Sequence, residues 1–274
     1  MLKQRIATAL VLLAILLPAI FWFQPLVWGA VTLVFLAIAA NEWVALLGRP
    51  RIAWRVAGLI ALSGLIILVW RTERPWPGMS LALIAAALTL FWCVAGGWRL
   101  YHGQARGGGW PLASVLLLGC WLALYELREQ GVLALLSSMA VVWVADVAAY
   151  FVGRAIGRHK LAPAISPGKS WEGAIGGMVA VALIGWLAAV RPGLGTDSLP
   201  GLLESRTSPM TMVALLVVLA CLSIVGDLHE SLLKRQAGVK DSGKLLPGHG
   251  GVLDRIDALI PVMPAALLLY QLFR

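Results

Sequence analysis

The sequence predicts an all-α, polytopic integral membrane protein. Of its 274 residues, 60% are hydrophobic and only 13% are charged, and the mean hydropathy is +0.87. The apolar residues fall in runs of roughly 17 to 23 residues, and a helix of about 20 residues crosses the ~30 Å hydrocarbon layer of a bilayer. We therefore expect one membrane domain rather than the two soluble domains that the length alone suggests.

Nine membrane-spanning helices, give or take one, are predicted. They lie at about 6–23, 26–47, 55–71, 79–98, 111–126, 132–153, 174–190, 208–226 and 252–273. The first run follows Lys3 and Arg5 as in a signal peptide, but no small-residue cleavage site follows it, so we expect it to stay as a helix. Within the one membrane domain, helices of 1–126 are expected to serve packing and anchoring, and 127–274 is expected to carry the chemistry.

The distribution of Lys and Arg predicts the orientation. With a cytoplasmic N-terminus, 16 of the 22 basic residues flank cytoplasmic helix ends, and cytoplasmic loops retain positive charge during insertion. This orientation places the two longest charged loops, 154–173 and 227–251, on the same side of the membrane. The two loops are therefore expected to meet although they are far apart in the sequence.

The net charge of +9 does not indicate nucleic acid as a partner. The cations are spread over membrane-flanking loops, and no nucleic-acid-binding module is visible. Anionic lipid headgroups are the expected counter-charge. The three cysteines stand singly in apolar segments, so we expect reduced, structural thiols.

Two acids lie inside predicted helices, where a charge needs a partner or a wet cavity. Glu42 lies about a turn and a half inside its helix, and the sequence does not identify its partner. Asp146 lies roughly 10 Å inside its helix, and Tyr150 and Arg154 follow it at i+4 and i+8 on one face. This stripe is a candidate site, and a buried structural pair of Asp146 with Arg154 is the alternative.

The loop 154–173 combines cations and hydroxyls with glycine and proline, which lets backbone amides and cations converge on phosphate oxygens. Its candidate substrate-binding residues are Arg154, Ser166, Lys169, Ser170 and Glu172. The GKS sequence at 168–170 does not complete a P-loop, because Pro163 stands where that motif has glycine and no strand is predicted before it. A merely solvated loop would explain the arginines but not the Ser, Glu and Gly placement. Gly173 and Gly177 predict a close helix contact.

The densest chemistry lies between residues 227 and 257. Asp227 and Glu230 share a face if their helix continues one more turn, and Asp254 and Asp257 repeat that spacing at the start of the last helix. Such carboxylate pairs suit a hard cation such as Mg²⁺, which takes oxygen ligands and keeps substrate phosphate in its shell. The cations expected to neutralise phosphate are Lys234, Arg235, Lys240 and Lys244. A solvated amphipathic loop is the alternative.

The run S-x-x-K-R-x₄-K-D-x-G-x₂-L-P-x-H-G-G-x-x-D-R-x-D, Ser231 to Asp257, resembles the signature of phosphatidate cytidylyltransferases, also called CDP-diacylglycerol synthases. Every fixed position is filled, and the upstream segments DVAAYFVGR and ISPGKSWEG also resemble this family. The resemblance implies Mg²⁺-dependent transfer of a cytidylyl group from CTP to phosphatidic acid, giving CDP-diacylglycerol and pyrophosphate for phospholipid biosynthesis. It further implies a bacterial cytoplasmic membrane with the active site facing the cytoplasm. A homodimer would suit it, although the sequence shows no interface.

Residue roles follow from this resemblance together with the chemistry of the side chains. Mg²⁺, with a second cation considered, is assigned to Asp227, Asp254, Asp257 and Asp146. The candidate catalytic residues are Lys234, Arg235, Lys240, Asp241, His249 and Asp254, and Lys244 and Arg255 join the substrate-binding set of the first loop. Ser166, Ser170 and His249 are expected to hydrogen-bond phosphate or orient ligands, and Glu172 to fix a lysine.

Other classes of protein remain open. A secondary transporter would also carry intramembrane acids, but it should show matching interruptions in both halves, whereas here the charged features cluster in the second half. A CDP-alcohol phosphotransferase or a CTP-dependent lipid kinase would act at the same surface. The D-G-x₂-A-R-x₈-G-x₃-D-x₃-D pattern of the phosphotransferases is absent.

Overall fold

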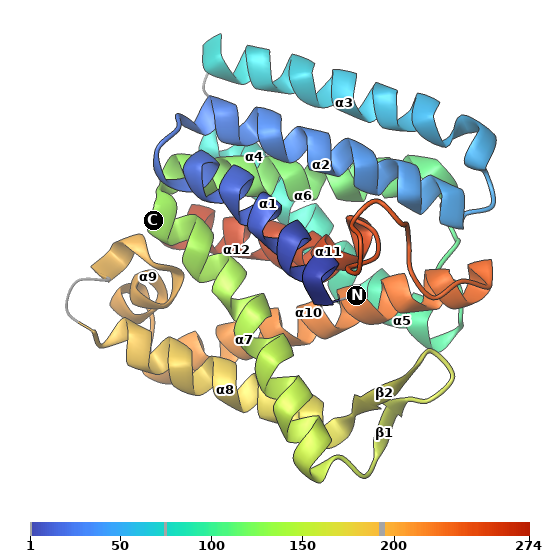
Figure 1. The fold of residues 1–274 in the computed structure, drawn as a ribbon. Coiled ribbons are helices and arrows are strands. Elements are labelled where there is room, and N and C mark those ends of the chain that lie inside the picture. Colours follow the sequence, from blue (N-terminus) through green and yellow to red (C-terminus); the bar gives the residue numbers. More distant parts are fainter. Residues whose placement is uncertain (1, 74–75, 192–194) are drawn as a thin grey trace.

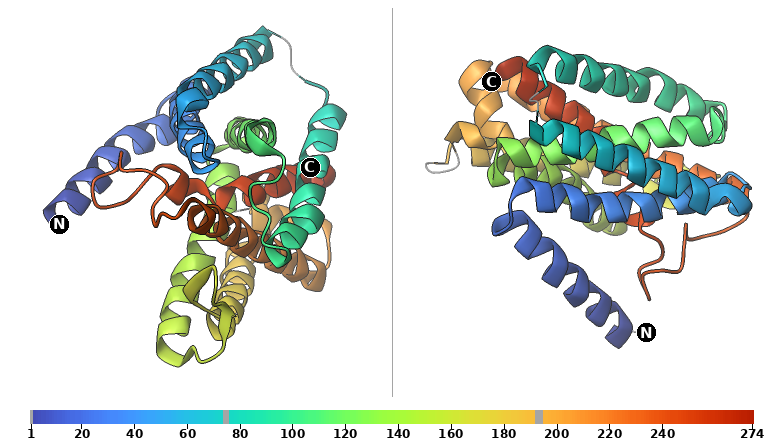
Figure 2. Two further views of the ribbon diagram at one scale, coloured as in Figure 1. Left: turned by 90° about the vertical axis from the view of Figure 1, so that its right-hand side faces the viewer. Right: turned by 90° about the horizontal axis from the view of Figure 1, so that it is seen from above.

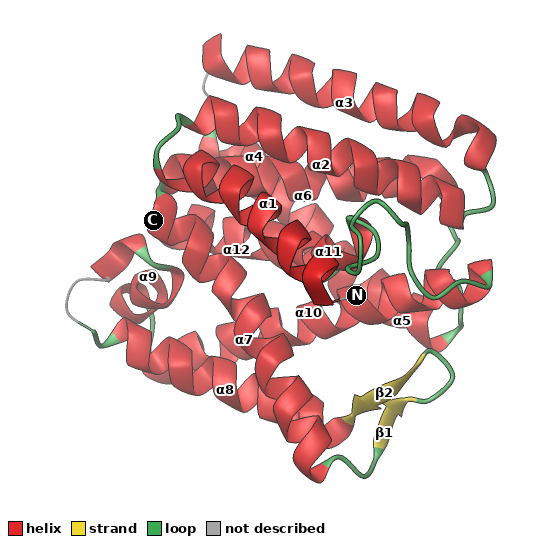
Figure 3. Ribbon diagram, in the orientation of Figure 1, coloured by secondary structure: helices red, strands yellow, loops and turns green. Residues whose placement is uncertain are grey.

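The computed structural model describes residues 2–73, 76–191 and 195–274, and the described chain is almost entirely helical (Figures 1 and 3). The helices are α1 (Leu2–Phe21), α2 (Pro25–Leu46), α3 (Pro50–Glu73), α4 (Gly78–Phe91), α5 (Gly97–Tyr101), α6 (Gly109–Gln130), α7 (Val132–Ile156), α8 (Trp171–Ala189), α9 (Leu199–Arg206), α10 (Pro209–Ala237), α11 (Leu253–Ile256) and α12 (Leu259–Phe273). A π-helical turn, Trp92–Gly96, joins α4 to α5, and a 3-10 turn, Gly195–Asp197, precedes α9. The predicted all-α class is confirmed.

Eight segments within the described ranges are helical, long and apolar enough to cross a bilayer. They are Pro25–Leu46, Pro50–Arg71, Gly78–Tyr101, Gly109–Gln130, Val132–Ile156, Trp171–Ala189, Pro209–Ala237 and Leu253–Phe273. Helix α1 adds a shorter apolar segment, Ile6–Phe21. The chain is therefore a polytopic membrane protein, whereas the count of nine spans and the cytoplasmic side of the N-terminus stay predictions.

Consecutive long helices run in opposite directions, so their connections collect at two ends of the bundle (Figures 1 and 2). At one end, Arg106 after α5 donates to the carbonyls of Leu46, at the end of α2, and Gln236, at the end of α10, at 3.2 and 2.6 Å. At the other end, Arg128 of α6 donates to the carbonyl of Ile20 in α1 at 2.9 Å. Both charged loops lie at the first of these ends, in agreement with the sequence analysis.

Three large polar side chains of the N-terminal helices find partners on neighbouring helices, which matters where no water is present. The indole nitrogens of Trp28 and Trp121 donate to the carbonyls of Leu124 and Gly29 at 3.1 and 2.9 Å, which ties α2 to α6. Near the C-terminal ends of α3 and α6, Arg71 donates to both carboxylate oxygens of Glu126 at 2.5 and 2.8 Å. These contacts hold α2, α3 and α6 together as a scaffold.

Helices α7 and α8 approach at backbone distance. A Cβ atom added to Gly173 would lie 2.7 Å from the Ala149 carbonyl oxygen, and one added to Gly177 would lie 2.8 Å from that of Ala145. The close contact predicted for these two glycines is confirmed. Between the two helices the expected loop contains a short antiparallel hairpin, β1 (Lys160–Ala162) and β2 (Ser166–Ser170), which the sequence analysis did not predict.

Helix α10 is about three turns longer than predicted, because it continues past residue 226 to Ala237. Leu228, Leu232 and Leu233 remain buried along this extension, so the apolar face does not stop where the charges begin. The helix ends at Gly238, whose φ of 73° is the left-handed conformation that closes helix C-termini. The extension places the charged residues that follow position 226 on a rigid helical face.

The last predicted span, 252–273, is broken into α11 and α12 at Asp257 and Ala258. Pro261 carries no N–H to donate to the Asp257 carbonyl, so one helical hydrogen bond is missing at this point. The Asp257 carboxylate instead accepts from the backbone N–H of Ala258 at 2.8 Å. The break therefore turns the Asp257 side chain toward its own backbone at the entrance of the final helix.

Candidate active site

A cavity of about 710 Å³, lined by many charged side chains, lies between α7, α8, α10, the hairpin and the segment 238–257. Its charged lining consists of Arg154, Lys169, Lys234, Arg235, Lys240 and Arg255 with Asp146, Asp227, Asp241, Asp254 and Asp257, and Tyr150, Ser166, Ser170 and Ser231 add hydroxyl groups. All but three of the candidate residues predicted from the sequence line this cavity. The three that do not are Glu172, Lys244 and His249.

Two contacts join the hydrophilic loops around the cavity. The Lys169 ammonium, at the end of the hairpin, lies 2.5 Å from a carboxylate oxygen of Asp227 on α10. Arg235 donates from Nε to the carbonyl of Ile165 in the hairpin at 3.1 Å. The meeting of the two loops, which the distribution of basic residues implied, is therefore present in the structure.

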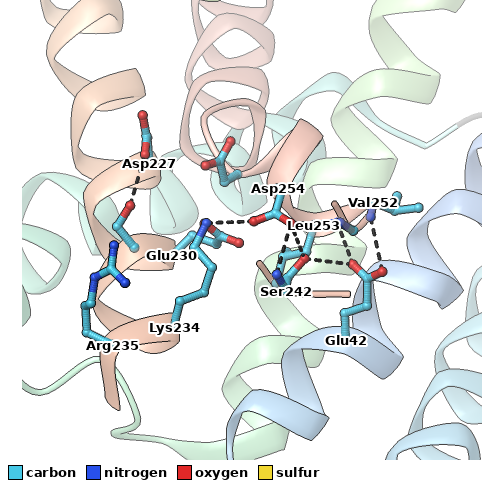
Figure 4. Close-up of polar contacts among 12 residues, drawn as sticks. Glu42, Asp227, Glu230, Lys234, Arg235, Ser242, Val252, Leu253 and Asp254 are labelled. Atoms are coloured by element: carbon cyan, nitrogen blue, oxygen red, sulfur yellow. Dashed lines mark hydrogen bonds and ion pairs between the residues drawn. The ribbon is translucent and has the colours of Figure 1, made fainter. Parts of the chain in front are cut away.

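The extension of α10 presents Asp227, Ser231 and Lys234 along one face. Lys234 lies between two carboxylates, those of Glu230 and of Asp254, with its Nζ 2.6 Å from Oδ1 of Asp254 (Figure 4). The side chains of Lys234, Glu230 and Asp254 are only 14%, 4% and 6% exposed. Sequence reasoning placed Glu230 on the face of Asp227 but not in the site, although its i, i+4 spacing from Lys234 was a readable signal.

Asp254 is held by the segment that precedes it. Its Oδ2 accepts from the backbone N–H groups of Ser242 and Gly251 at 2.9 and 2.8 Å and from the Ser242 hydroxyl at 3.0 Å. Gly250 has a φ of 83°, and a Cβ atom there would lie 2.6 Å from Oδ2. Asp254 therefore accepts three hydrogen bonds, from two backbone N–H groups and from Lys234, and shares the single proton of the Ser242 hydroxyl with Glu42. Glycine is required beside it.

Asp146, Asp227 and Asp257 come from three different elements and line the same cavity. Gly226 permits the approach of α10, since a Cβ atom there would lie 2.5 Å from the Asp257 carbonyl oxygen. The charge of Asp227 acts on the carboxyl groups of both other acids. Within the described ranges, no three His, Cys, Asp or Glu side chains are placed together as a ready-made metal site. The metal assignment accordingly stays a prediction.

The stripe on α7 has the predicted arrangement. Asp146, Tyr150 and Arg154 all line the cavity, and Arg154 donates from Nη1 to the Tyr150 hydroxyl at 2.9 Å. A structural ion pair of Asp146 with Arg154, the alternative interpretation, is not among the ion pairs of the described residues. The stripe therefore belongs to the cavity wall.

Glu172 and Ser170 make contacts that the sequence analysis did not predict. Glu172, expected to fix a lysine, instead accepts from the backbone N–H of His159 at 3.2 Å and pairs with its ring Nδ1 at 2.6 Å. The Ser170 hydroxyl caps α8 by accepting from the Gly173 N–H at 3.2 Å, while still lining the cavity. Both residues therefore shape the hairpin-to-helix junction.

Comparison with known sequences identifies the family of this chain. A sequence model described as the cytidylyltransferase family matches residues 3–273. The chain belongs to the cytidylyltransferase family. A Pseudomonas aeruginosa protein named phosphatidate cytidylyltransferase is 39% identical over 280 residues, covering 98% of this chain and 97% of that protein. Proteins of the same name from Haemophilus influenzae and Brucella suis are 35% and 39% identical, covering 96% and 98% of this chain and 96% and 92% of their own lengths.

Membership in the cytidylyltransferase family confirms the resemblance found in Ser231 to Asp257 and identifies the chain as an enzyme. The family match covers the N-terminal helices as well as the signature. The cavity is therefore the candidate active site of a cytidylyltransferase.

Proposed function

We propose that this protein transfers the cytidylyl group of CTP to phosphatidic acid, producing CDP-diacylglycerol and pyrophosphate for phospholipid biosynthesis. The names of its relatives support this activity. The observation that carries the proposal is the cavity in which the cations and carboxylates of both hydrophilic loops meet at the ends of membrane helices. A lipid phosphate and a nucleotide triphosphate repel one another, and a site of this kind brings them together and stabilises their charge.

In the proposed reaction, an oxygen of the phosphatidate phosphate attacks the α-phosphorus of CTP. A bond forms between that oxygen and the α-phosphorus, and the bond from the α-phosphorus to the oxygen bridging to the β-phosphate breaks. The bridging oxygen leaves with its electron pair as part of pyrophosphate. Because a phosphate monoester is already ionised near neutral pH, the protein has to position the reactants and stabilise developing charge rather than remove a proton.

The cations of the cavity divide into two groups. Lys169 and Lys234 are held by carboxylates, which fix where their ammonium groups can meet a phosphate. No ion pair among the described residues engages the other cations that line the cavity, namely Arg154, Arg235, Lys240 and Arg255. We assign these four to the phosphate oxygens of CTP and phosphatidic acid, because guanidinium and ammonium groups form charge-assisted hydrogen bonds with phosphate.

The carboxylates of the cavity fit Mg²⁺ by their chemistry. Mg²⁺ prefers oxygen ligands and is usually bound by one or two carboxylates together with substrate phosphates, so a cage of protein ligands is not needed. Asp227, Asp257 and Asp146, which line the same cavity, are the residues that would hold it. Asp254 already accepts hydrogen bonds from Lys234 and from two backbone N–H groups, so its contacts suit holding Lys234 at least as well as binding metal. When bound, Mg²⁺ would neutralise phosphate charge and polarise the α-phosphoryl group; a second cation remains a prediction.

Labelled CTP tests the proposal directly. The purified full-length chain is incubated in vesicles containing phosphatidic acid and Mg²⁺ with CTP labelled at either the α- or the γ-phosphate. We expect the α-label in the lipid fraction with an equal release of pyrophosphate. The γ-label in the lipid would indicate a lipid kinase, and CTP left unconsumed would leave transport; either result overturns the proposal.

Asp254→Asn provides a variant of the same assay. Asparagine keeps the size of the side chain but loses the charge that faces Lys234, so we expect turnover to disappear while expression and membrane insertion are retained. Near-normal activity in this variant would remove Asp254 from the active site.

The location also belongs to the proposal. The bacterial relatives and the bias of Lys and Arg toward one end of the bundle favour a bacterial cytoplasmic membrane with the cavity facing the cytoplasm. A single cysteine introduced at an exposed position of the segment 238–252, in a cysteine-free background, should react with an impermeant thiol reagent only from the cytoplasmic side. Reaction from the outside would reverse the orientation. A homodimer remains a prediction.

A further inference from the structure

Glu42 is a buried carboxylate of α2, in the half of the chain that contributes no residue to the cavity lining. It is 5% exposed, and among the described residues it forms no ion pair. A buried carboxylate without a cation is costly unless hydrogen bonds compensate its charge. The contacts that Glu42 makes therefore account for its presence inside the membrane domain.

Those contacts all come from the segment 242–253. Oε2 of Glu42 accepts from the Ser242 hydroxyl at 3.1 Å and from the Leu253 N–H at 2.8 Å, and Oε1 accepts from the Val252 N–H at 3.1 Å (Figure 4). Ser242 lies near the start of this segment, and Val252 and Leu253 lie at its end. One side chain of α2 thus ties together both ends of a segment that lies 200 to 211 positions away in the sequence.

The segment is shaped around this carboxylate by glycine. A Cβ atom added to Gly251 would lie 2.5 Å from Oε2 of Glu42, and one added to Gly243 would collide with Oε1. No side chain other than hydrogen therefore fits at either position while Glu42 keeps its place. The glycines and the carboxylate form one matched unit.

The same unit holds the active-site residues that Glu42 does not touch. The Ser242 hydroxyl is within reach of both Glu42 and Asp254, at 3.1 and 3.0 Å, and Asp254 in turn holds Lys234 at 2.6 Å. The acid on α2 is therefore linked through Ser242 and the backbone to the lysine that faces the cavity.

We propose that Glu42 is a positioning residue of the active site, which fixes the segment 242–253 and through it Asp254 and Lys234. The expected loss of kcat rests on the proposed cytidylyl transfer, whereas the expected loosening of the segment 242–253 does not. The carboxylate is needed because both of its oxygens accept hydrogen bonds. Glutamine has one accepting oxygen and would turn its NH₂ group toward a donor, and aspartate is shorter by one methylene group.

The experiment compares Glu42→Gln and Glu42→Asp with Glu126→Gln, in the full chain in detergent and in vesicles. Glu126 is the matched control because it is also a buried glutamate of the N-terminal half, but it pairs with Arg71 and lies away from the segment 242–253. The first readout is tryptic cleavage after Lys240 and Lys244. The digestion is run below the thermal unfolding midpoint of each variant, and the products are followed by mass spectrometry. We expect faster cleavage at these two sites in both Glu42 variants and no change in Glu126→Gln.

The second readout is kinetic. Loss of a residue that holds catalytic groups in place typically costs roughly 10- to 100-fold in activity, so kcat should fall by that factor in Glu42→Gln while KM for CTP changes less than about threefold. A loss confined to the amount of folded protein, with kcat per folded molecule unchanged, would mean that Glu42 is merely structural and would overturn the proposal.

The two readouts separate this proposal from the proposed function. If the wild-type chain shows no cytidylyl transfer, the function fails, and the cleavage pattern alone still decides whether Glu42 holds the segment. Cleavage after Lys240 and Lys244 at the wild-type rate in Glu42→Gln would refute the positioning role, and so would equal acceleration in Glu126→Gln.

Discussion

Gly226→Ala tests whether the backbone approach of α10 to the break before α12 sets the geometry of the active site. The added Cβ atom would start 2.5 Å from the Asp257 carbonyl oxygen and 2.8 Å from the ring of Pro261. Carbon-to-oxygen contacts normally lie at about 3.3 Å or more, so the two elements would have to separate by roughly 1 Å. Asp227 follows Gly226 on α10, and Asp257 belongs to the chain that Gly226 contacts. A separation of these two elements would therefore move two acids of the cavity apart.

A displacement of about 1 Å in an active site can cost roughly a hundredfold in rate, and overpacking of this kind costs typically 1–3 kcal/mol in stability. We therefore expect Gly226→Ala to lower cytidylyl transfer by one to two orders of magnitude with a modest drop in thermal unfolding midpoint. The assay is α-labelled CTP incorporation into lipid, normalised to folded protein.

Gly58→Ala is the matched control. Gly58 also lies within a long helix, α3, but outside its own helical turn no atom lies within 4 Å of its added Cβ. Alanine also favours a helix over glycine by up to about 1 kcal/mol. This variant should keep wild-type activity and an equal or higher unfolding midpoint. Wild-type turnover in Gly226→Ala would refute the reasoning that this close approach positions the acids.

Three further predictions follow from the contacts of the site. Lys234→Met leaves the buried carboxylates of Glu230 and Asp254 without the ammonium group between them. Chemical denaturation should show a free energy of unfolding lower by about 3–5 kcal/mol. Unchanged stability would contradict the buried ion cluster. Ser170→Ala removes the cap of α8 and should lower the free energy of unfolding by about 1 kcal/mol. Ser170→Asp keeps an accepting oxygen for the Gly173 N–H and should lose less stability. Equal losses in the two variants would count against the cap. Chelation of divalent metal should abolish turnover and added Mg²⁺ should restore it, and full activity in excess chelator would exclude the proposed metal.

The parts of this structure that the sequence predicted depend on local patterns. Continuous apolar runs located the membrane helices, and the clustering of Lys and Arg placed two distant loops at one end of the bundle. The spacing of Asp146, Tyr150 and Arg154 predicted one face of a helix, and that face lines the cavity.

What could not be predicted depends on tertiary contacts. The end of α10 was placed too early because charges at Asp227 and Glu230 were taken to mark the membrane surface, whereas the leucines beyond them stay buried. The partner of Glu42 is a set of backbone N–H groups and a serine hydroxyl far along the chain, and backbone donors leave no trace in a sequence. Glu172 bonds His159 because the unpredicted hairpin brings them together.

The backbone contact between α7 and α8 determines how one wall of the cavity is held. Gly173 and Gly177 leave no side-chain layer between α7 and α8, so the two helices form one closely packed unit. This unit and the hairpin that joins its helices carry one wall of the cavity, with Asp146, Tyr150, Arg154 and Lys169. The opposite wall, which carries Lys240, Asp241 and Arg255, is anchored mainly at two carboxylates, Glu42 and Asp254. One wall of the cavity is therefore held by direct backbone contact between two helices, and the other by hydrogen bonds that end at two buried carboxylates.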